Sequence, residues 1–227
     1  KDVGDEAYLL KQNLEDAHVI VEKNRVKACL LAKKVFLSKL AILDDGFQYR
    51  RLKKDMDIVV VDALYPFSNG CFLPAGLLRE EISALKRANI IFLTHTDQVC
   101  SGEKELLKNK LLRIKDFPII ETVHKPICFI NSMTNEKKEI HWINKKDIFG
   151  LCSIIRSSPK RKTLKSLGAN IIKLIQFPDH YWYRKKDLDS LKHNLVVTTE
   201  KDSIRFPDIY PFWVLKIEIE ITKGKKI

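Results

Sequence analysis

Two adjacent carboxylates, Asp44 and Asp45, are the residues of this chain best suited by type and position to phosphate chemistry. They follow the apolar run Leu40–Leu43, and they precede Gly46 and a pair of arginines at positions 50 and 51. In a nucleotide-binding α/β protein, carboxylates at the carboxyl end of a buried strand hold Mg²⁺ beside phosphate groups. A strand that simply ends in an Asp-Gly turn is the alternative, and these residues alone leave both interpretations open.

Four further segments place polar side chains beside expected strands or helices. They are Val3–Glu6, the loop at 62–81, Phe177–Tyr181 and Val197–Asp202. Asp5 precedes an expected helix, so helix capping is the alternative to a chemical role. His180 could carry a proton, or it could be a surface histidine at a helix start. Thr199 and Asp202 fit a capping box. A long loop at the carboxyl end of a strand is typical of function in this fold class, and a Pro- and Gly-rich connection without a role is the alternative.

Short apolar strands alternate with amphipathic stretches along the chain, which predicts a mostly parallel α/β sheet. The expected strands are His18–Val21, Leu40–Leu43, Asp57–Asp62, Asn89–Thr94, Ile127–Asn131, Ile148–Ile154, Asn170–Ile175, Asn194–Thr198 and Phe212–Ile219; the expected helices are Arg25–Leu37, Glu103–Ile114, Lys160–Leu167 and Lys186–His193. The run at 58–61 is apolar throughout, which predicts helices on both faces of the sheet. The segment 117–147 reads as a short β linker between two α/β lobes.

The composition indicates a globular, basic protein. Lys and Arg outnumber Asp and Glu by 41 to 29, giving a net charge of +12. Such an excess favours an anionic partner, whether nucleic acid, lipid headgroups or a phosphorylated substrate, although general lysine richness is the alternative. The five cysteines form no Cys-x-x-Cys pair, which favours a reducing compartment. No apolar run is long enough to cross a bilayer, so no transmembrane segment is expected.

No phosphate-binding motif of the form G-x-x-x-x-G-K-[ST] or G-x-G-x-x-G is present. A nucleotide enzyme built on this chain would therefore need its phosphate cradle elsewhere. The first residue is Lys1 and a motif begins almost at once. We therefore expect these residues to be a piece of a longer chain.

Taken in order, the motifs resemble those of the tetraacyldisaccharide 4'-kinase family of lipid A biosynthesis, over most of the chain. Residues 3–6 are similar to its V-G-D-E-P segment, and 44–51 to its D-D-G-F-Q-H-R-R signature. Residues 73–81 resemble L-P-A-G-P-L-R-E-P, 177–181 resemble F-x-D-H-H, and 198–202 match T-T-E-K-D. The chain departs from these patterns at Ala7, Tyr49, Leu77 and Glu81, and around 156–159.

The resemblance implies a P-loop NTPase-like fold with a mostly parallel sheet and helices on both faces. It implies a kinase-like core lobe at 1–116 without its N-terminal P-loop region, a β-rich linker at 117–147 and a C-terminal α/β lobe at 148–227. The implied reaction moves the γ-phosphate of ATP to the 4'-hydroxyl of a tetraacyldisaccharide 1-phosphate and gives lipid IVA. The expected setting is the cytoplasmic face of the inner membrane, on an anionic membrane surface and without nucleic acid.

Residue roles follow from the same resemblance. Asp5 would be the catalytic base and His180 its partner. Asp44 and Asp45 would bind the cofactors ATP and Mg²⁺. The substrate-binding residues would be Arg25, Arg79 and Glu80.

Two other functions stay open at this point. The chain could be a non-catalytic remnant or binding protein of the same fold, or a basic α/β protein that binds nucleic acid with steep salt dependence. We expect the 227 residues alone to be inactive.

Overall fold

The computed structural model describes residues 4–153, 158–178, 181–207 and 210–224. The chain forms two compact units. Unit 1 comprises Lys1–Val21 and Pro126–Glu218, and unit 2 comprises Glu22–Lys125 and Ile219–Ile227. Two long strands, β3 (Ile119–Asn131) and β8 (Trp213–Lys223), contribute residues to both units. Compact units are not by themselves domains, so the domain boundaries at 117 and 148 stay a prediction.

Unit 2 is a small parallel sheet with helices. Its further elements are α2 (Arg25–Val35), β1 (Ile58–Asp62), η1 (Ile82–Arg87), β2 (Ile90–Thr94) and α3 (Ser101–Leu112). The strands β1, β2 and β3 are parallel neighbours, with Ile58 opposite Ile90 and Ile91 opposite Ile119. The carboxyl ends of β1 and β2 therefore lie at one edge of the sheet.

The core of unit 2 lies on one face of this sheet. Every second residue of β1 and β2 points to it, including Val61, Ile91 and Leu93, and α3 adds Leu107 and Leu111. The opposite face of β1 stays exposed: the relative exposure of Ile58 is 50% and that of Val60 is 65%. The apolar run at 58–61 predicted two covered faces, and among the described residues that prediction is wrong for β1.

Unit 1 is an α/β layer built mainly of parallel strands. Its further elements are α1 (Asp5–Asn13), β4 (Lys137–Glu139), η2 (Ile140–Ile143), β5 (Asp147–Cys152), α4 (Ser158–Ser166), β6 (Asn170–Gln176), α5 (Lys185–Leu188), η3 (Asp189–Leu191), β7 (Val196–Thr199) and α6 (Glu200–Ser203). The strand order in this part is β3-β8-β7-β5-β6, with β4 antiparallel to β3. The pairs β5–β6, β5–β7 and β7–β8 are parallel.

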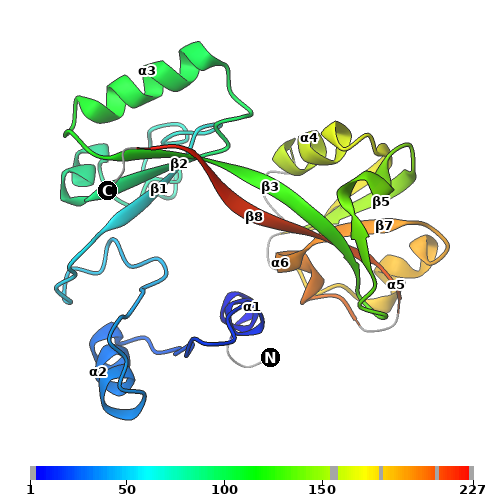
Figure 1. The fold of residues 1–227 in the computed structure, drawn as a ribbon, viewed down its shortest axis with the longest axis horizontal. Helices are drawn as coiled ribbons and strands as arrows, with labels where there is room; N and C mark the ends of the chain where they lie inside the picture. The colour runs from blue at the N-terminus through cyan, green and yellow to red at the C-terminus, as the bar shows by residue number, and fades with distance from the viewer. Residues whose placement is uncertain (1–3, 154–157, 179–180, 208–209, 225–227) are drawn as a thin grey trace. The chain divides into compact units, whose positions relative to one another are not determined.

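Helices cover both faces of this layer, as Figure 1 shows for α4 and α5 beside β5 and β7. On one face Val197 of β7 packs with Leu164 of α4. On the other face the adjacent Val196 packs with Leu188 of α5 and Leu191 of η3. Because neighbouring strand residues point to opposite faces, both faces are buried here. The predicted α/β class is confirmed.

Two expected strands are not formed. Residues 18–21 and 40–43 are described, and neither range forms a strand of the sheet. Leu40 is 77% exposed and Ile42 is 88% exposed. A strand is stabilised by its ladder partner, and apolar content alone does not supply one. Within the part of the chain that the structure describes, no helix is long and apolar enough to cross a membrane.

Candidate active site

The turn at Asp44 and Asp45 belongs to unit 2. Asp45 adopts a left-handed backbone, with φ of 51°. Gly46 is buried, and a Cβ there would lie 2.7 Å from the Cβ of Leu43, so the close approach requires glycine. The ammonium of Lys54 donates to the carbonyl oxygen of Gly46 at 2.9 Å, which fixes the far side of the turn.

Two predicted substrate-binding arginines reach this turn. Arg25 donates from Nη2 to the carbonyl oxygen of Asp44 at 3.2 Å. Arg79 forms an ion pair with the Oδ2 of Asp45 at 2.5 Å, and both side chains are more than half exposed. The structure therefore brings together four of the predicted site residues. An exposed ion pair of this kind contributes little to stability, so a phosphate could replace the carboxylate at Arg79 at small cost.

Glu80, the fifth predicted residue in unit 2, is held by two other arginines. Its Oε2 lies 2.5 Å from Nη2 of Arg87, and its Oε1 lies 3.3 Å from Nη2 of Arg50. The hydrogen bond from Arg87 is the largest cause that lowers the pKa of Glu80 below 4.5, and burial opposes it. Glu80 is therefore ionised at neutral pH. It borders a cavity of about 390 Å³ that is also lined by Glu81 and Ser83.

The long loop that carries Arg79 is ordered by its own hydrogen bonds. Asn69 donates from Nδ2 to the carbonyl oxygen of Ala75 at 2.9 Å, and its Oδ1 accepts from the amide of Cys71 at 3.1 Å. The amide of Gly76 donates to the carbonyl oxygen of Phe72 at 2.9 Å. Because internal contacts determine its path, this loop can present Arg79 in a defined place.

The donor set at Asp44 and Asp45 fits a magnesium ion bound mainly through phosphate and water. In the described ranges there is no group of three or more His, Cys, Asp or Glu side chains that could hold a metal. Mg²⁺ usually binds through one or two carboxylates and completes its shell with waters and substrate phosphates. Two exposed neighbouring carboxylates satisfy that requirement.

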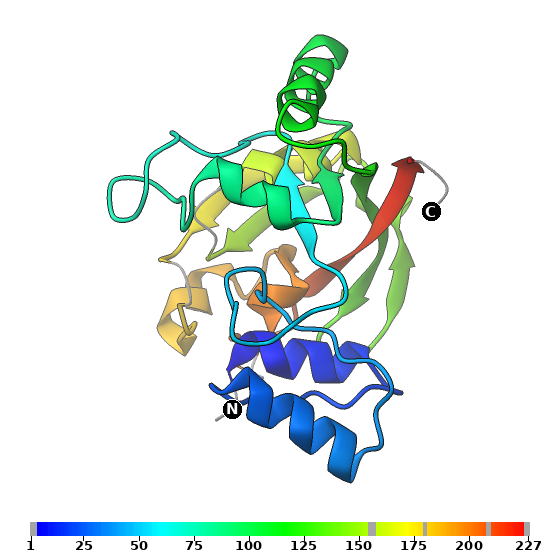
Figure 2. The same ribbon diagram turned by 90° about the vertical axis from the view of Figure 1, so that its left-hand side faces the viewer.

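Asp5 belongs to unit 1, where α1 lies against α6 (Figure 2). It is the first residue of α1 and Gly4 is the N-cap, so the alternative of a capping aspartate is wrong. Its Oδ2 instead accepts from Nε of Arg205 at 2.8 Å and also from Nη2 of the same guanidinium. The Arg205 side chain is 1% exposed.

A polar cluster behind Asp5 fixes Arg205. Nη1 of Arg205 donates to the hydroxyl of Ser153 at 2.5 Å, and Ser153 donates from its backbone amide and its hydroxyl to Oδ1 of Asp202. Thr199 donates from Oγ1 to Oδ2 of Asp202 at 2.9 Å, and it also caps α6. The predicted Thr199 cap is confirmed, but the sequence reasoning missed Arg205. Its one sequence signal is a charged residue between Ile204 and Phe206.

The remaining predicted contacts stay predictions. His180 lies outside the described residues, so its pairing with Asp5 is not decided. Asp5 belongs to unit 1, whereas Asp44 and Asp45 belong to unit 2. Their common cleft is therefore a prediction too.

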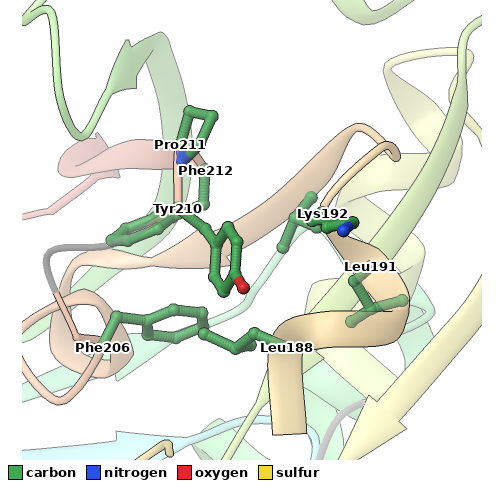
Figure 3. Close-up of a pocket in the computed structure, with 8 residues that line it drawn as sticks. Leu188, Leu191, Lys192, Phe206, Tyr210, Pro211 and Phe212 are labelled. Atoms are coloured by element: carbon green, nitrogen blue, oxygen red, sulfur yellow. The ribbon is translucent and has the colours of Figure 1, made fainter. Parts of the chain in front are cut away.

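An apolar pocket in unit 1 is too small to be a ligand site. It lies between Leu188, Leu191, Phe206 and Tyr210, as Figure 3 shows. Its volume is about 10 Å³, roughly the room that one water molecule needs. Its room is therefore that of about one water molecule, and no argument for an acyl-chain site rests on it.

The parallel strands and the helices beside them define an α/β protein. A crystal structure of LpxK from Aquifex aeolicus, described as an "apo" form in complex with ATP, has the same fold with a TM-score of 0.69 and 25% sequence identity. The match covers 97% of this chain and 65% of that chain.

The profile of the family described as tetraacyldisaccharide-1-P 4'-kinase matches residues 1–227, so this chain belongs to that family. The tetraacyldisaccharide 4'-kinase of Elusimicrobium minutum is 37% identical over 98% of this chain, and that of Anaeromyxobacter sp. strain K is 31% identical over 100% of it. In both cases the chain spans 63% of the relative's length.

Proposed function

We propose that the complete protein carrying this chain transfers the γ-phosphate of ATP to the 4'-hydroxyl of a tetraacyldisaccharide 1-phosphate, which yields lipid IVA in lipid A biosynthesis. The observation that carries the proposal is the family match over residues 1–227. The contacts of Arg25 and Arg79 with the acidic turn support it, because the implied phosphate-handling residues meet in one unit.

In this proposal the 4'-hydroxyl oxygen attacks the γ-phosphorus. A bond from that oxygen to phosphorus forms while the bond from phosphorus to the β–γ bridging oxygen breaks, and ADP leaves. The hydroxyl proton passes to the carboxylate of Asp5. His180 shares this proton and orients the carboxylate. The contact between Asp5 and Arg205 supports a carboxylate that is held in one orientation.

Asp44 and Asp45 would hold Mg²⁺ at the phosphate end of this reaction. The ion would neutralise charge on the phosphoryl oxygens. Arg79 would move from Asp45 to a phosphate oxygen when nucleotide binds, and Arg25 would bind the phosphate of the acyl disaccharide. Glu80 would keep Arg50 and Arg87 in place beside the substrate.

We also propose a peripheral position on the cytoplasmic face of the inner membrane. The substrate is a lipid, and the net charge of +12 favours anionic headgroups.

The test is phosphate transfer from γ-labelled ATP to the acceptor lipid by the complete protein at a series of Mg²⁺ concentrations. Asp44→Ala and Asp45→Ala should leave the fold intact because both side chains are exposed, and at least one should need much more Mg²⁺. Glu105→Ala, which removes an exposed carboxylate on α3, should titrate normally.

Normal Mg²⁺ titrations for both aspartate variants would discard the metal assignment. A folded complete protein that transfers no phosphate would instead favour the non-catalytic relative, to which the departures at Ala7 and Tyr49 point.

A further inference from the structure

We propose that Arg205 is a positioning residue, which holds the carboxylate of Asp5 in the orientation that proton transfer requires. The inference rests on the proposed function of Asp5 as base. It adds a residue, together with the polar cluster that fixes it, to the predicted pair of Asp5 and His180.

The first argument is geometric. Arg205 approaches a single oxygen of Asp5, Oδ2, with both Nε and Nη2. The other oxygen, Oδ1, accepts from the backbone amide of Glu6 at 3.1 Å. A planar guanidinium that uses two donors on one oxygen fixes the direction of the carboxylate better than a single ammonium does.

The second argument is that Arg205 itself has little freedom. Its third nitrogen donates to Ser153, and Ser153 is held by Asp202, which is fully buried. Asp202 is in turn held by Thr199. Buried charged groups that are fully hydrogen-bonded keep a single arrangement, because any other arrangement would leave a charge unpaired.

The third argument is position. Ser153 directly follows β5, and Thr199 ends β7. These parallel strands place their carboxyl ends at one edge of the sheet, where α/β proteins bind ligands. Arg205 therefore connects Asp5, 200 residues earlier in the chain, to that edge.

A role in holding α1 alone would not explain this arrangement. No residue of α1 is buried, and three more exposed contacts already tie the helix to the rest of unit 1. Lys201 pairs with Glu6 at 2.8 Å, Lys216 donates to Asn13 at 2.9 Å, and Asn13 donates to Glu200 at 3.3 Å. A buried ion pair is a costly way to add a further tether, since apolar contacts of equal volume are often as stabilising.

The experiment is a double-mutant cycle on the complete protein with ATP and the acceptor lipid. Arg205→Lys keeps the charge but loses the paired donors, so kcat should fall roughly 100-fold with little change in the KM for ATP. Asp5→Asn combined with Arg205→Lys should be no slower than Asp5→Asn alone, because Arg205 acts through Asp5. Additive losses in the double variant would overturn the proposal.

The matched control is Asn13→Ala, which removes another tether of α1 and leaves Asp5 untouched. It should keep the wild-type kcat. A loss equal to that of Arg205→Lys would show that anchoring of the helix is the whole effect, and this too would overturn the proposal.

A structural readout separates this inference from the proposed function. In nitrogen-15 NMR, the Nε–H proton of Arg205 should exchange slowly in the wild-type protein and faster in Asp5→Asn. If the wild-type protein transfers no phosphate, the proposed function fails and the positioning role fails with it. If the wild-type protein transfers phosphate but the Nε–H proton of Arg205 exchanges at the same rate in the wild-type protein and in Asp5→Asn, only the role of Arg205 fails.

Discussion

Lys160 is a buried lysine of unit 1. Burial is the largest cause that lowers its pKa, to about 8, and the charges of Cys152 and Asp202 oppose this only in part. Its ammonium donates to the carbonyl oxygen of Leu151, which also accepts from Oγ1 of Thr198 at 3.0 Å. If the ammonium is removed, the carbonyl oxygen of Leu151 therefore still accepts a hydrogen bond from Thr198.

We predict that Lys160→Met is at least as stable as the wild-type protein at pH 7. The folded pKa is about 8 and the unfolded value is 10.5, so the unfolded state binds more protons between these values. The wild-type protein should therefore gain up to about 3 kcal/mol relative to the variant as pH rises from 8 to 10.5.

Urea unfolding of both proteins at pH 7 and pH 10 measures this difference. A difference in the free energy of unfolding between the two proteins that is the same at both pH values would contradict the lowered pKa of Lys160.

At the residue scale, the sequence predicted the site side chains that stand in local sequence motifs. Asp44, Asp45 and Arg79 stand in recognisable motifs, and the structure shows Arg79 in contact with Asp45. Arg205 and Lys160 could not be found this way, because burial is a property of the tertiary structure. The apolar neighbours of Arg205 are too weak a signal to distinguish one buried cation among 41 Lys and Arg residues.

At the scale of elements, the loop between Tyr65 and Glu80 depends on one close approach. A Cβ on Gly76 would lie 2.2 Å from Oδ1 of Asn69 and 2.2 Å from the carbonyl oxygen of Cys71. Neither atom can easily move, since Oδ1 of Asn69 already accepts from the amide of Cys71.

Gly76→Ala should therefore lower the free energy of unfolding by roughly 1–3 kcal/mol, through overpacking of the loop. Gly102→Ala is the control, because a Cβ there meets nothing within 4 Å and the residue lies in α3. It should raise the free energy of unfolding by up to about 1 kcal/mol. Equal stability of the two variants in urea would show that the loop has no such constraint.

The sequence predicted elements well where their signal is local. The observed β1, β2 and β6 agree with the predicted strands to within one residue at each end. The observed β3 begins at Ile119, whereas the predicted strand began at Ile127. Charged residues and Pro126 hid its first half, because proline in a strand interior argues against a strand. The predicted strand at 40–43 was wrong for the opposite reason: the run has the composition of a strand but no neighbouring strand in the sheet.

At the scale of the whole molecule, contacts between distant segments assemble the units. The first 21 residues belong with residues 126–218, and the last nine belong with residues 22–125. Local sequence patterns do not report such pairings. The family resemblance was therefore the stronger guide to the fold, and the family match over residues 1–227 confirms the family.

The positive net charge of the chain predicts that the complete protein binds anionic membranes. It should float with vesicles that contain anionic lipid, and the bound fraction should fall as salt rises from about 0.05 to about 0.5 M because screening shortens the range of attraction. Vesicles of neutral zwitterionic lipid are the control. Equal binding to both, independent of salt, would contradict an electrostatic contribution.

The central claim is that Asp5 accepts the proton of the attacking hydroxyl. The most direct measurement compares kcat and the dissociation constant for ATP in the wild-type complete protein and in Asp5→Asn, with Asp16→Asn as an exposed acid near the end of α1 for control. We predict that Asp5→Asn lowers kcat by orders of magnitude while ATP binds unchanged, and that Asp16→Asn changes neither. An Asp5→Asn protein that turns over at the wild-type rate would contradict the account.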